Sequence, residues 1–282
     1  MTFSIVARAV DPGTGEPTWG VAVASKFLAV GSAVPAAVAG VGAIATQAEA
    51  NVAYKGLALA HLDEGATASV ALERLLEEDE RRDHRQVGIV DVDGNAASHT
   101  GPSCFAWAGG RTGSTEDGAY AIQGNILTGP EVVEAMEAAW LASSPEEPLQ
   151  HRLLAALAAG DEAGGDSRGR QSAALLVVRE EAGYGGNDDI AADLRVDDHA
   201  APITELKRLL DLSDFYLTAS TEAEKVQVTP EIEAEVETYA AAQGATGFLA
   251  WVATENYEMR VAEDLSWIDR RIVDIVDRKS VV

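Results

Sequence analysis

The sequence predicts a layered α+β fold, in which two antiparallel sheets lie face to face with helices outside each, followed by a small helical module. Three observations support this prediction. Apolar residues alternate with polar ones in short stretches typical of strands, and they recur every three or four residues in longer stretches typical of helices. The two kinds of stretch also come in separate runs, which favours α+β layers over a βαβ sheet.

The alternation predicts strands through most of the first 200 residues. The expected strands are residues 3–7, 18–24, 40–46, 86–92, 96–99, 120–123, 172–179 and 194–196. Residues 11–17, rich in Asp, Pro and Gly, form the turn of a first hairpin, and Asp93-Gly94 forms the turn of a second. We also expect the strand at 194–196 to pair with the strand at 172–179.

Helical spacing appears between these strands and after them. The expected helices are residues 54–62, 67–80, 131–142, 149–159 and 203–215, a helix beginning at 229–230, and residues 266–278. The stretch Thr128-Gly129-Pro130-Glu131 matches a capping box and is expected to open the helix at 131–142.

The domain organisation follows from length and from one polar segment. With 282 residues the chain is long for one domain and short for two large ones. Residues 218–228 are polar and acidic, which is typical of a linker. We therefore expect a main domain over residues 1–217, a linker over 218–228 and a small helical module over 229–282.

The composition indicates which partners and compartments fit. A net charge of -25 argues against nucleic acid and anionic lipid as partners. Acidic residues far outnumber the few lysines, as in a halophilic, salt-accumulating cytoplasm; an ordinary acidic protein is the alternative. No apolar run approaches the roughly 18 residues of a membrane span, and the first residues lack the pattern of a signal peptide. These features predict a cytoplasmic protein without a membrane partner.

Several motifs that would indicate other chemistry do not fit their context. Residues 164–171 nearly match a phosphate-binding loop, but the Lys and the Ser/Thr are missing and an apolar strand follows. Residues 91–95 resemble a calcium loop, but the glycine comes two positions early. The five histidines lack metal-ligand spacing. The lone Cys104 is expected to be a small buried residue rather than a nucleophile. We therefore expect neither a metal ion nor a cofactor.

Thr2 is the leading catalytic candidate because of its position. Methionine is normally trimmed before a small side chain, and removal of Met1 would leave an α-amine and a hydroxyl on Thr2. An α-amine titrates near pH 8, so it can take the hydroxyl proton directly or through water. The nucleophile and its base then belong to one residue. This signal is weak alone, because many proteins begin with Met-Thr.

Lys26 strengthens the interpretation. Antiparallel pairing of residues 3–7 with 18–24 places the end of the second strand, Ala24-Ser25-Lys26, beside the start of the first. A lysine there would lower the pKa of the Thr2 amine and stabilise the alkoxide. The alternative is a solvated lysine at a strand end.

Six sequence segments resemble one prokaryotic family. They are residues 2–8, 20–27, 42–48, 123–125, 164–174 and 194–199. Together they are similar to the domain-of-unknown-function family numbered one thousand and twenty-eight, which is grouped with the Ntn-hydrolase superfamily. The resemblance covers residues 1–217 and implies a four-layer αββα sandwich.

Two further details come from this resemblance. Residues 248–260 resemble the small peptidoglycan-binding module that follows this domain in some members, although peptidoglycan is a doubtful ligand for a cytoplasmic protein. Gly110 stands where we expect a histidine in the family, so specificity at this position can differ.

Chemistry and resemblance together supply the remaining candidates. Asn125 follows a glycine at a strand end, and its amide can donate to an oxyanion unless it only forms the turn. Gln47 can donate likewise, with simple packing as the alternative. Asp166, Arg168 and Arg170 lie in a Gly-rich loop, where Arg can bind a substrate carboxylate or an ion pair can hold the loop.

These observations predict a hydrolase that cleaves an amide or related C–N bond of a small molecule through Thr2. Lys26 tunes the amine, and Asn125 or a backbone N–H stabilises the oxyanion. The alternative is a non-catalytic binding or assembly protein on the same scaffold, because fold does not guarantee function. A homo-oligomer is expected, with a dimer favoured by an uncovered sandwich edge.

Overall fold

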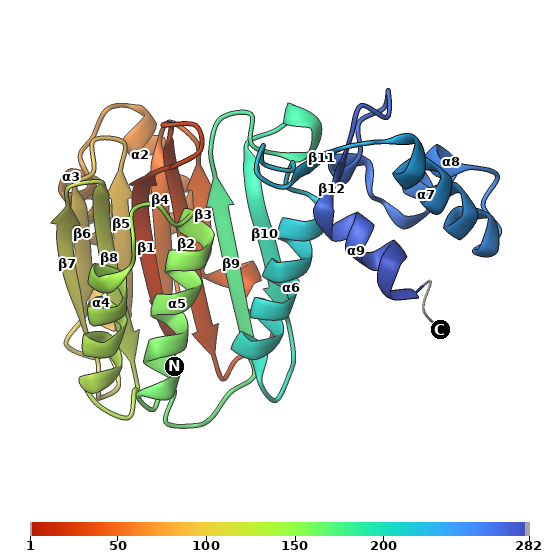
Figure 1. The fold of residues 1–282 in the computed structure, drawn as a ribbon. Coiled ribbons are helices and arrows are strands. Elements are labelled where there is room, and N and C mark those ends of the chain that lie inside the picture. Colours follow the sequence, from red (N-terminus) through yellow and green to blue (C-terminus); the bar gives the residue numbers. More distant parts are fainter. Residues whose placement is uncertain (1, 280–282) are drawn as a thin grey trace. The chain divides into compact units, whose positions relative to one another are not determined.

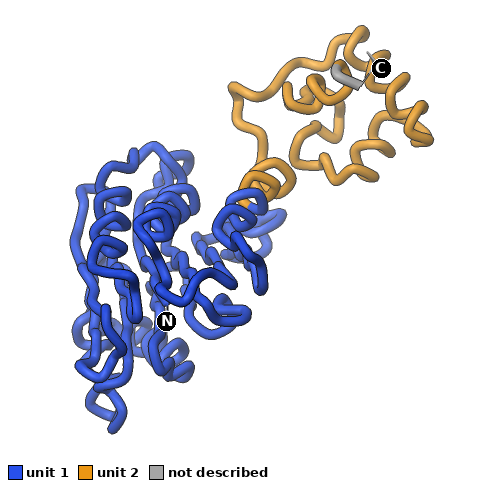
Figure 2. The backbone as a smooth tube through the Cα atoms, turned by 90° about the horizontal axis from the view of Figure 1, so that it is seen from below, with its two compact units in different colours: residues 1–209 blue, residues 210–282 orange. Residues whose placement is uncertain are grey.

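The computed structural model of this chain describes residues 2–279. The chain divides into two compact units, one ending at Leu209 and one beginning at Leu210 (Figure 2). The expected linker therefore does not coincide with the division, because residues 218–228 lie within the second unit. Each unit has a core of its own.

The larger sheet of the first unit has six strands, all paired antiparallel (Figure 1). In the order in which they lie side by side they are β10 (Ile190–Val196), β9 (Ser172–Val178), β2 (Pro17–Ser25), β1 (Thr2–Val10), β8 (Gly118–Asn125) and β7 (Gly109–Thr115). The strand that begins with Thr2 is thus in the middle of the sheet, between β2 and β8.

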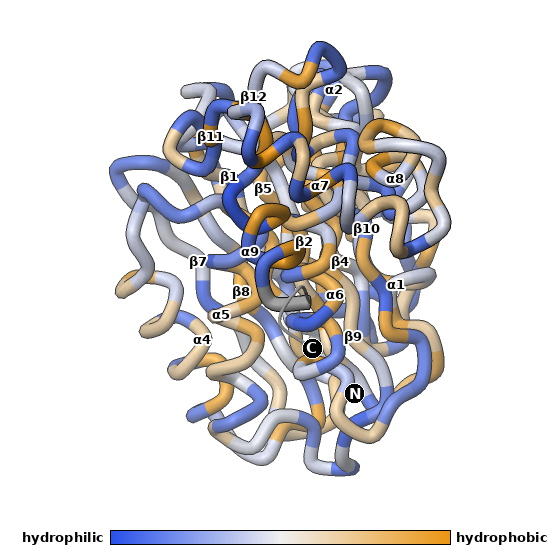
Figure 3. Tube along the Cα trace, turned by 45° about the vertical axis from the view of Figure 1, so that its right-hand side comes forward, coloured by the Kyte–Doolittle hydropathy of each residue, from blue (hydrophilic) through white to orange (hydrophobic). Residues whose placement is uncertain are grey.

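The smaller sheet has four strands, also antiparallel. They are β3 (Pro35–Val38), β4 (Gly42–Ala48), β5 (Arg85–Asp91) and β6 (Ala96–Thr100). One apolar cluster joins the two sheets: Val6 and Val23 of the larger sheet pack with Ala45 and Val90 of the smaller one. Apolar residues are accordingly concentrated along the strands, as the orange segments of Figure 3 show.

Helices cover the other faces of the sheets. The helices that begin in this unit are α1 (Val30–Ala33), α2 (Tyr54–Asp63), α3 (Ala68–Glu77), α4 (Glu131–Ala142), α5 (Leu149–Glu162) and α6 (Pro202–Tyr216). The short α1 is the exception, because Val30 packs into the apolar cluster between the sheets. Ile44 and Ile89 of the smaller sheet pack against Leu72 of α3 in a second cluster. On the larger sheet, α5 contacts β1 and β2, and a Cβ at Gly20 would lie 2.6 Å from Leu153 of that helix.

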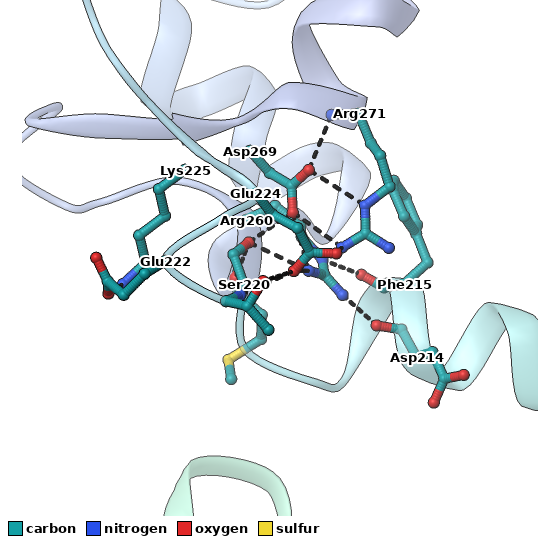
Figure 4. Close-up of polar contacts among 11 residues, drawn as sticks. Asp214, Phe215, Ser220, Glu222, Glu224, Lys225, Arg260, Asp269 and Arg271 are labelled. Carbon is teal, nitrogen blue, oxygen red and sulfur yellow. Dashed lines mark hydrogen bonds and ion pairs between the residues drawn. The ribbon is translucent and has the colours of Figure 1, made fainter. Parts of the chain in front are cut away.

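The second unit contains α7 (Pro230–Ala242), α8 (Phe248–Glu255), α9 (Arg270–Lys279) and a two-stranded sheet of β11 (Lys225–Gln227) and β12 (Trp267–Asp269). Edge-to-face contacts of Trp251 with Tyr239 and Tyr257 lie in its core. A buried ion pair joins Arg260 to Asp269, with 2.9 Å between Nη1 and Oδ2 (Figure 4).

Further polar contacts surround this ion pair. Arg260 also donates to Ser220 Oγ and to the carbonyls of Asp214 and Phe215. Burial raises the pKa of the Asp269 carboxyl, but hydrogen bonds from Arg271 and Ser220 outweigh burial and hold that pKa well below its usual range. The Asp269 carboxyl is therefore ionised in the folded unit.

The predicted α+β fold of antiparallel sheets is confirmed. Both predicted hairpins form, and the strand ending at Val196 pairs with β9 as expected. Thr67 and Thr229 cap the helices that follow them, since each side chain accepts a backbone N–H three residues ahead. Among residues 2–279, no helix is both long and apolar enough to span a bilayer.

Some element boundaries differ from the predictions. The strand expected at residues 40–46 begins at Gly42, and β3 precedes it across a turn at Gly40, where φ is 71°. The strand β7 was not predicted, because its Gly, Thr and Ser residues show no apolar alternation. The helix expected over 266–278 begins only at Arg270, since Asp269 accepts the Arg271 N–H and ends β12.

The capping box at Thr128 does not form. The helix α4 has Pro130 at its N-cap, without a side-chain cap, so Glu131 occupies the first helical position instead of the third. The Thr128 backbone N–H instead donates to the Gly165 carbonyl. The loop that carries Gly165 thus holds the chain before α4. A capping pattern covers only four consecutive residues, so it cannot predict a contact with this distant loop.

Candidate functional site

Thr2 lies at the end of the larger sheet, enclosed by its two neighbouring strands. It is 6% exposed, and its backbone pairs with Asn125 of β8. On the other side, the pairing of Phe3 with Ala24 brings Ser25 beside it. Thr2 Oγ1 lies 3.1 Å from Ser25 Oγ, and Ser25 is 2% exposed. The hydroxyl of Thr2 therefore has a fixed, buried polar neighbour.

The carbonyl of Thr2 is held by two side-chain amides. Asn125 Nδ2 lies 3.4 Å from the Thr2 oxygen, and Gln47 Nε2, which comes from the smaller sheet, lies 3.3 Å from it. The same two amides also donate to Gln86 Oε1, each over 2.9 Å. Asn125 and Gln47 therefore meet at Thr2 as the sequence suggested, but their N–H groups are engaged by internal acceptors rather than aimed at an external oxyanion.

Lys26 follows β2 and is tied to the Gly-rich loop. Its backbone N–H donates to Asp166 Oδ2 over 2.7 Å, and its Nζ donates to the Arg170 carbonyl over 3.3 Å. The side chain is exposed. Within residues 2–279 the hydrogen-bond acceptor of the ammonium group is thus this loop and not Thr2.

The Gly-rich loop itself is held by its own charges. Asp166 is 7% exposed, and its Oδ1 accepts the Arg168 backbone N–H over 2.9 Å, while the Arg168 guanidinium lies 3.4 Å from Oδ2. Arg170 Nε donates to both carboxylate oxygens of Asp161, at 2.7 and 2.9 Å, and this contact raises the pKa of Arg170. Both arginine side chains are about half exposed, so each retains a solvent-facing part of its guanidinium.

A small cavity adjoins Ser25 on the helix-covered side of the sheet. It is lined by Phe3, Ala24, Ser25, Asp161, Asp166, Gly169, Arg170, Ser172, Pro202 and Ile203. Its lining thus combines the charged side chains of Asp161, Asp166 and Arg170 with apolar side chains such as Phe3 and Ile203. The cavity connects Ser25, the neighbour of the Thr2 hydroxyl, with the Gly-rich loop.

Cys104 and Gly110 have structural surroundings that explain their residue types. Cys104 is half-buried, its Sγ lies 3.4 Å from the Arg85 carbonyl, and burial raises the pKa of its thiol, which disfavours the nucleophilic thiolate. Gly110 pairs with Gln123, and a Cβ at this position would lie 2.7 Å from the Ile122 carbonyl oxygen. A histidine at position 110 would require the backbone to shift.

Two functional candidates were missed from the sequence, namely Ser25 and Gln86. Ser25 stood within a recognised motif, yet its role depends on lying directly across from Thr2. Gln86 is the second residue of β5, and together with Ser4, Gln47 and Gln123 it is a polar residue at an inward-facing strand position. A polar residue that interrupts an otherwise apolar inward face is the signal that could have identified it.

Fold and site together define an α+β protein whose first unit contains two antiparallel sheets, and a buried threonine near the chain start begins a central strand of the larger one. The chain belongs to a family of unknown function, DUF1028, whose model matches residues 2–206. The crystal structure of protein SPO2555 from Silicibacter pomeroyi, described with the same family model, is similar with a TM-score of 0.65. Its sequence identity is 32%, and the match covers 76% of this chain and 89% of that chain.

A second solved structure is similar at a lower level. It is Anbu, an ancestral beta-subunit from Yersinia bercovieri, with a TM-score of 0.35 and 11% identity over 75% of this chain and 94% of that chain. No curated protein matches the sequence significantly.

Proposed function

We propose that this protein is an N-terminal-nucleophile hydrolase that cleaves an amide or related C–N bond of a small substrate. In this proposal the two sheets and their covering helices are the four-layer αββα sandwich of the Ntn-hydrolase superfamily. Removal of Met1 makes Thr2 the first residue. The packing of two sheets on a shared apolar cluster, with helices on the opposite faces, supports the sandwich assignment.

The observation that carries the proposal is the fixed position of the Thr2 hydroxyl. A threonine at a chain start is ordinarily mobile, whereas here Oγ1 lies 3.1 Å from Ser25 Oγ and the Thr2 carbonyl is within reach of two amides. Holding a nucleophile in one geometry lowers the entropic part of the activation barrier. An unreactive threonine at this position would not need such support.

The chemistry follows from these groups. The neutral α-amine of Thr2 takes the Oγ1 proton, directly or through the Ser25 hydroxyl, while Oγ1 attacks the substrate carbonyl carbon. The resulting tetrahedral intermediate breaks its C–N bond as the α-ammonium returns the proton to the leaving nitrogen. This leaves an ester on Thr2, which water hydrolyses with the same amine as base.

The surrounding residues take roles that fit their contacts. Asn125 and Gln47 hold the Thr2 carbonyl, so the oxyanion is left to backbone N–H groups at the strand ends. Lys26, whose ammonium group donates to the Arg170 carbonyl, tunes the Thr2 amine through its charge rather than through a direct contact. Arg168, anchored by Asp166, and Arg170, anchored by Asp161, present guanidinium groups to a carboxylate on the substrate.

A non-catalytic binding or assembly protein is the second candidate. It is favoured by one observation: the amide donors of Asn125 and Gln47 are engaged within the protein, so the site offers few polar side chains to a transition state. In that reading, the polar contacts around Thr2 only stabilise the end of the sheet.

Replacement of Thr2 separates the two candidates. Thr2→Ala and Thr2→Ser are compared with wild type against a panel of amides and ureido acids, with Thr112→Ala, an exposed threonine of β7, as the matched control. The hydrolase proposal predicts turnover by wild type, Thr2→Ser and Thr112→Ala, and none by Thr2→Ala. Equal turnover by Thr2→Ala would rule out Thr2 as the nucleophile.

We also propose a cytoplasmic setting with high salt, because a net charge of -25 causes self-repulsion that salt screens. Thermal unfolding in rising KCl, with sucrose as the uncharged control, tests this proposal. Within residues 2–279, β6 and β7 are edge strands with no further strand paired to them, which further favours a homo-oligomer.

A further inference from the structure

Four side-chain amides gather between the two sheets, directly beneath Thr2. They belong to Gln47 of β4, Gln86 of β5, and Gln123 and Asn125 of β8, and we call them the amide layer. Each is at most 1% exposed. Burying four amides in an otherwise apolar interior is costly unless their hydrogen bonds are made, so the layer calls for a functional explanation.

Gln86 is the centre of this layer. Its Nε2 donates to three oxygens: Thr100 Oγ1 at 2.9 Å, the Gly109 carbonyl at 3.2 Å and the Gly124 carbonyl at 2.8 Å. Its Oε1 accepts from Gln47 and from Asn125. One fully buried side chain therefore connects strands of both sheets to the two amides that hold Thr2.

The chemistry of these partners fixes the orientation of three of the four amides, whereas the buried Oε1 of Gln123 has no hydrogen-bond partner among residues 2–279. Backbone carbonyls only accept, so the side of Gln86 that faces Gly109 and Gly124 must be Nε2. Its Oε1 must then face Asn125 and Gln47, so each of these amides presents a nitrogen to it. The same nitrogens are the ones that reach the Thr2 carbonyl, which also only accepts.

The opposite end of Gln47 is fixed as well. Ser4 Oγ donates to Gln47 Oε1 over 2.8 Å, and Gln123 Nε2 donates to Ser4 Oγ over 2.6 Å. Gln47 therefore cannot rotate its amide by half a turn without losing acceptors on one side and donors on the other. From Gln86 through Gln47 and Asn125 to Thr2, each side-chain N–H therefore faces an oxygen that can accept it.

We propose that Gln86 is a positioning residue of the Thr2 site, which orients the amides of Asn125 and Gln47 so that they hold the Thr2 carbonyl and thereby aim Oγ1. This inference rests on the proposed function. Gln86 does not touch the substrate, because it is 0% exposed and enclosed between the sheets. Its substitution changes how often Thr2 adopts the reactive geometry rather than how tightly a substrate binds.

The probe for this proposal is p-nitrophenyl acetate. Thr2 Oγ1 attacks the ester carbonyl, its proton passes to the α-amine, and the C–O bond to nitrophenolate breaks, which leaves an acetyl ester on Thr2. Hydroxylamine removes an acetyl ester but not an acetyl amide, so it distinguishes acylation of the hydroxyl from acylation of the amine. The release of nitrophenolate gives the maximal acylation rate and the probe concentration at half that rate.

The test compares Gln86→Met with Asp91→Ala in the full-length protein. Asp91 is the matched control, because it is 2% exposed, lies at the far end of the same strand β5 and accepts backbone N–H groups there, including that of Ala68. Each variant loses a buried polar side chain that makes several hydrogen bonds. We expect the maximal acylation rate to fall about 10- to 100-fold in Gln86→Met, with half-saturation unchanged, and to stay near wild type in Asp91→Ala.

Each outcome decides between the claims. If wild type is acylated at Thr2 and Gln86→Met keeps the rate of Asp91→Ala, the positioning role is overturned and the proposed function stands. If wild type releases nitrophenolate no faster than Thr2→Ala and gains no acetyl group at Thr2, on oxygen or on nitrogen, the proposed function fails, and this inference fails with it. Should Gln86→Met not fold, Gln47→Met replaces it with the same expectations, because it removes one of the two amides that Gln86 orients.

Discussion

The side-chain hydroxyls of Thr2 and Ser25 lie 3.1 Å apart across the β1–β2 hairpin, and both residues are buried. This contact places Ser25 within hydrogen-bond distance of Oγ1, and in the proposed mechanism Ser25 passes the Oγ1 proton to the Thr2 amine. Ser25→Ala should lower the maximal acylation rate of Thr2 by about tenfold or more, with little change in half-saturation. Ser69→Ala on the exposed face of α3 is the control, and a rate equal to it in Ser25→Ala would remove Ser25 from the mechanism.

Lys26 should act through its charge. Removing a nearby cation raises the pKa of an amine, so Lys26→Met should shift the pH midpoint of Thr2 acylation upward, toward the ordinary α-amine value of about 8. The pH dependence of the acylation rate measures this shift, and Lys207→Met, an exposed lysine of α6, is the control. An unchanged midpoint with a lower rate would mean that Lys26 only anchors the loop at Arg170.

Most elements of the first unit could be predicted from the sequence because their signals are local. The hairpin that begins at Phe3 and the helix at Tyr54–Asp63 follow from the spacing of apolar residues alone. The strand β7 could not be predicted in this way, because Gly109–Thr115 gains its stability from pairing with β8 and not from its own side chains. Tertiary pairing outweighs strand propensity there.

The site was predicted in part, for the same reason. Thr2, Asn125 and Gln47 do meet, since hairpin and sheet register bring them together. Their donor roles could not be foreseen, because the direction of each amide depends on Gln86, which comes from a strand of the other sheet. The spacing of residues in the sequence predicts which strand ends meet, but it does not predict which side chain donates to which acceptor there.

The first unit should lose stability in acid through Asp79. Asp79 Oδ2 accepts Arg85 Nε over 2.8 Å and the Tyr54 hydroxyl over 2.7 Å. The hydrogen bond from Arg85 is the main cause that holds the pKa of Asp79 well below its usual range. The folded state is therefore stabilised above the unfolded pKa of about 4, and this stabilisation is lost as the pH falls toward the lower folded value.

Asp79→Asn tests this contribution by urea unfolding at several pH values. At pH 7 the variant should be less stable by about 1–3 kcal/mol, and the difference from wild type should shrink below about pH 4, where the Asp79 carboxyl of the unfolded wild-type chain takes up its proton. Asp63→Asn, an exposed position on α2, should show no such pH-dependent difference. A difference that stays constant down to pH 2 would contradict the assignment.

The second unit should depend on Arg260. This residue is 1% exposed, and its replacement leaves the buried Asp269 without one of its cations. Arg260→Met should destabilise the unit by about 3–5 kcal/mol, seen as faster hydrogen exchange in α8 and α9 with exchange in β1 and β2 unchanged. Arg270→Met, at an exposed position of the same unit, should exchange like wild type. Equal exchange in both variants would show that the ion pair is not structurally important.

The most direct test of the central claim is the intact mass of the purified protein before and after treatment with p-nitrophenyl acetate. We expect a mass lower than that of the full 282-residue chain by one methionine, then a gain of one acetyl group that maps to Thr2 and is removed by hydroxylamine. A mature protein that retains Met1, or a trimmed protein that gains no acetyl group at Thr2 and releases nitrophenolate no faster than Thr2→Ala, would contradict the assignment of Thr2 as the nucleophile.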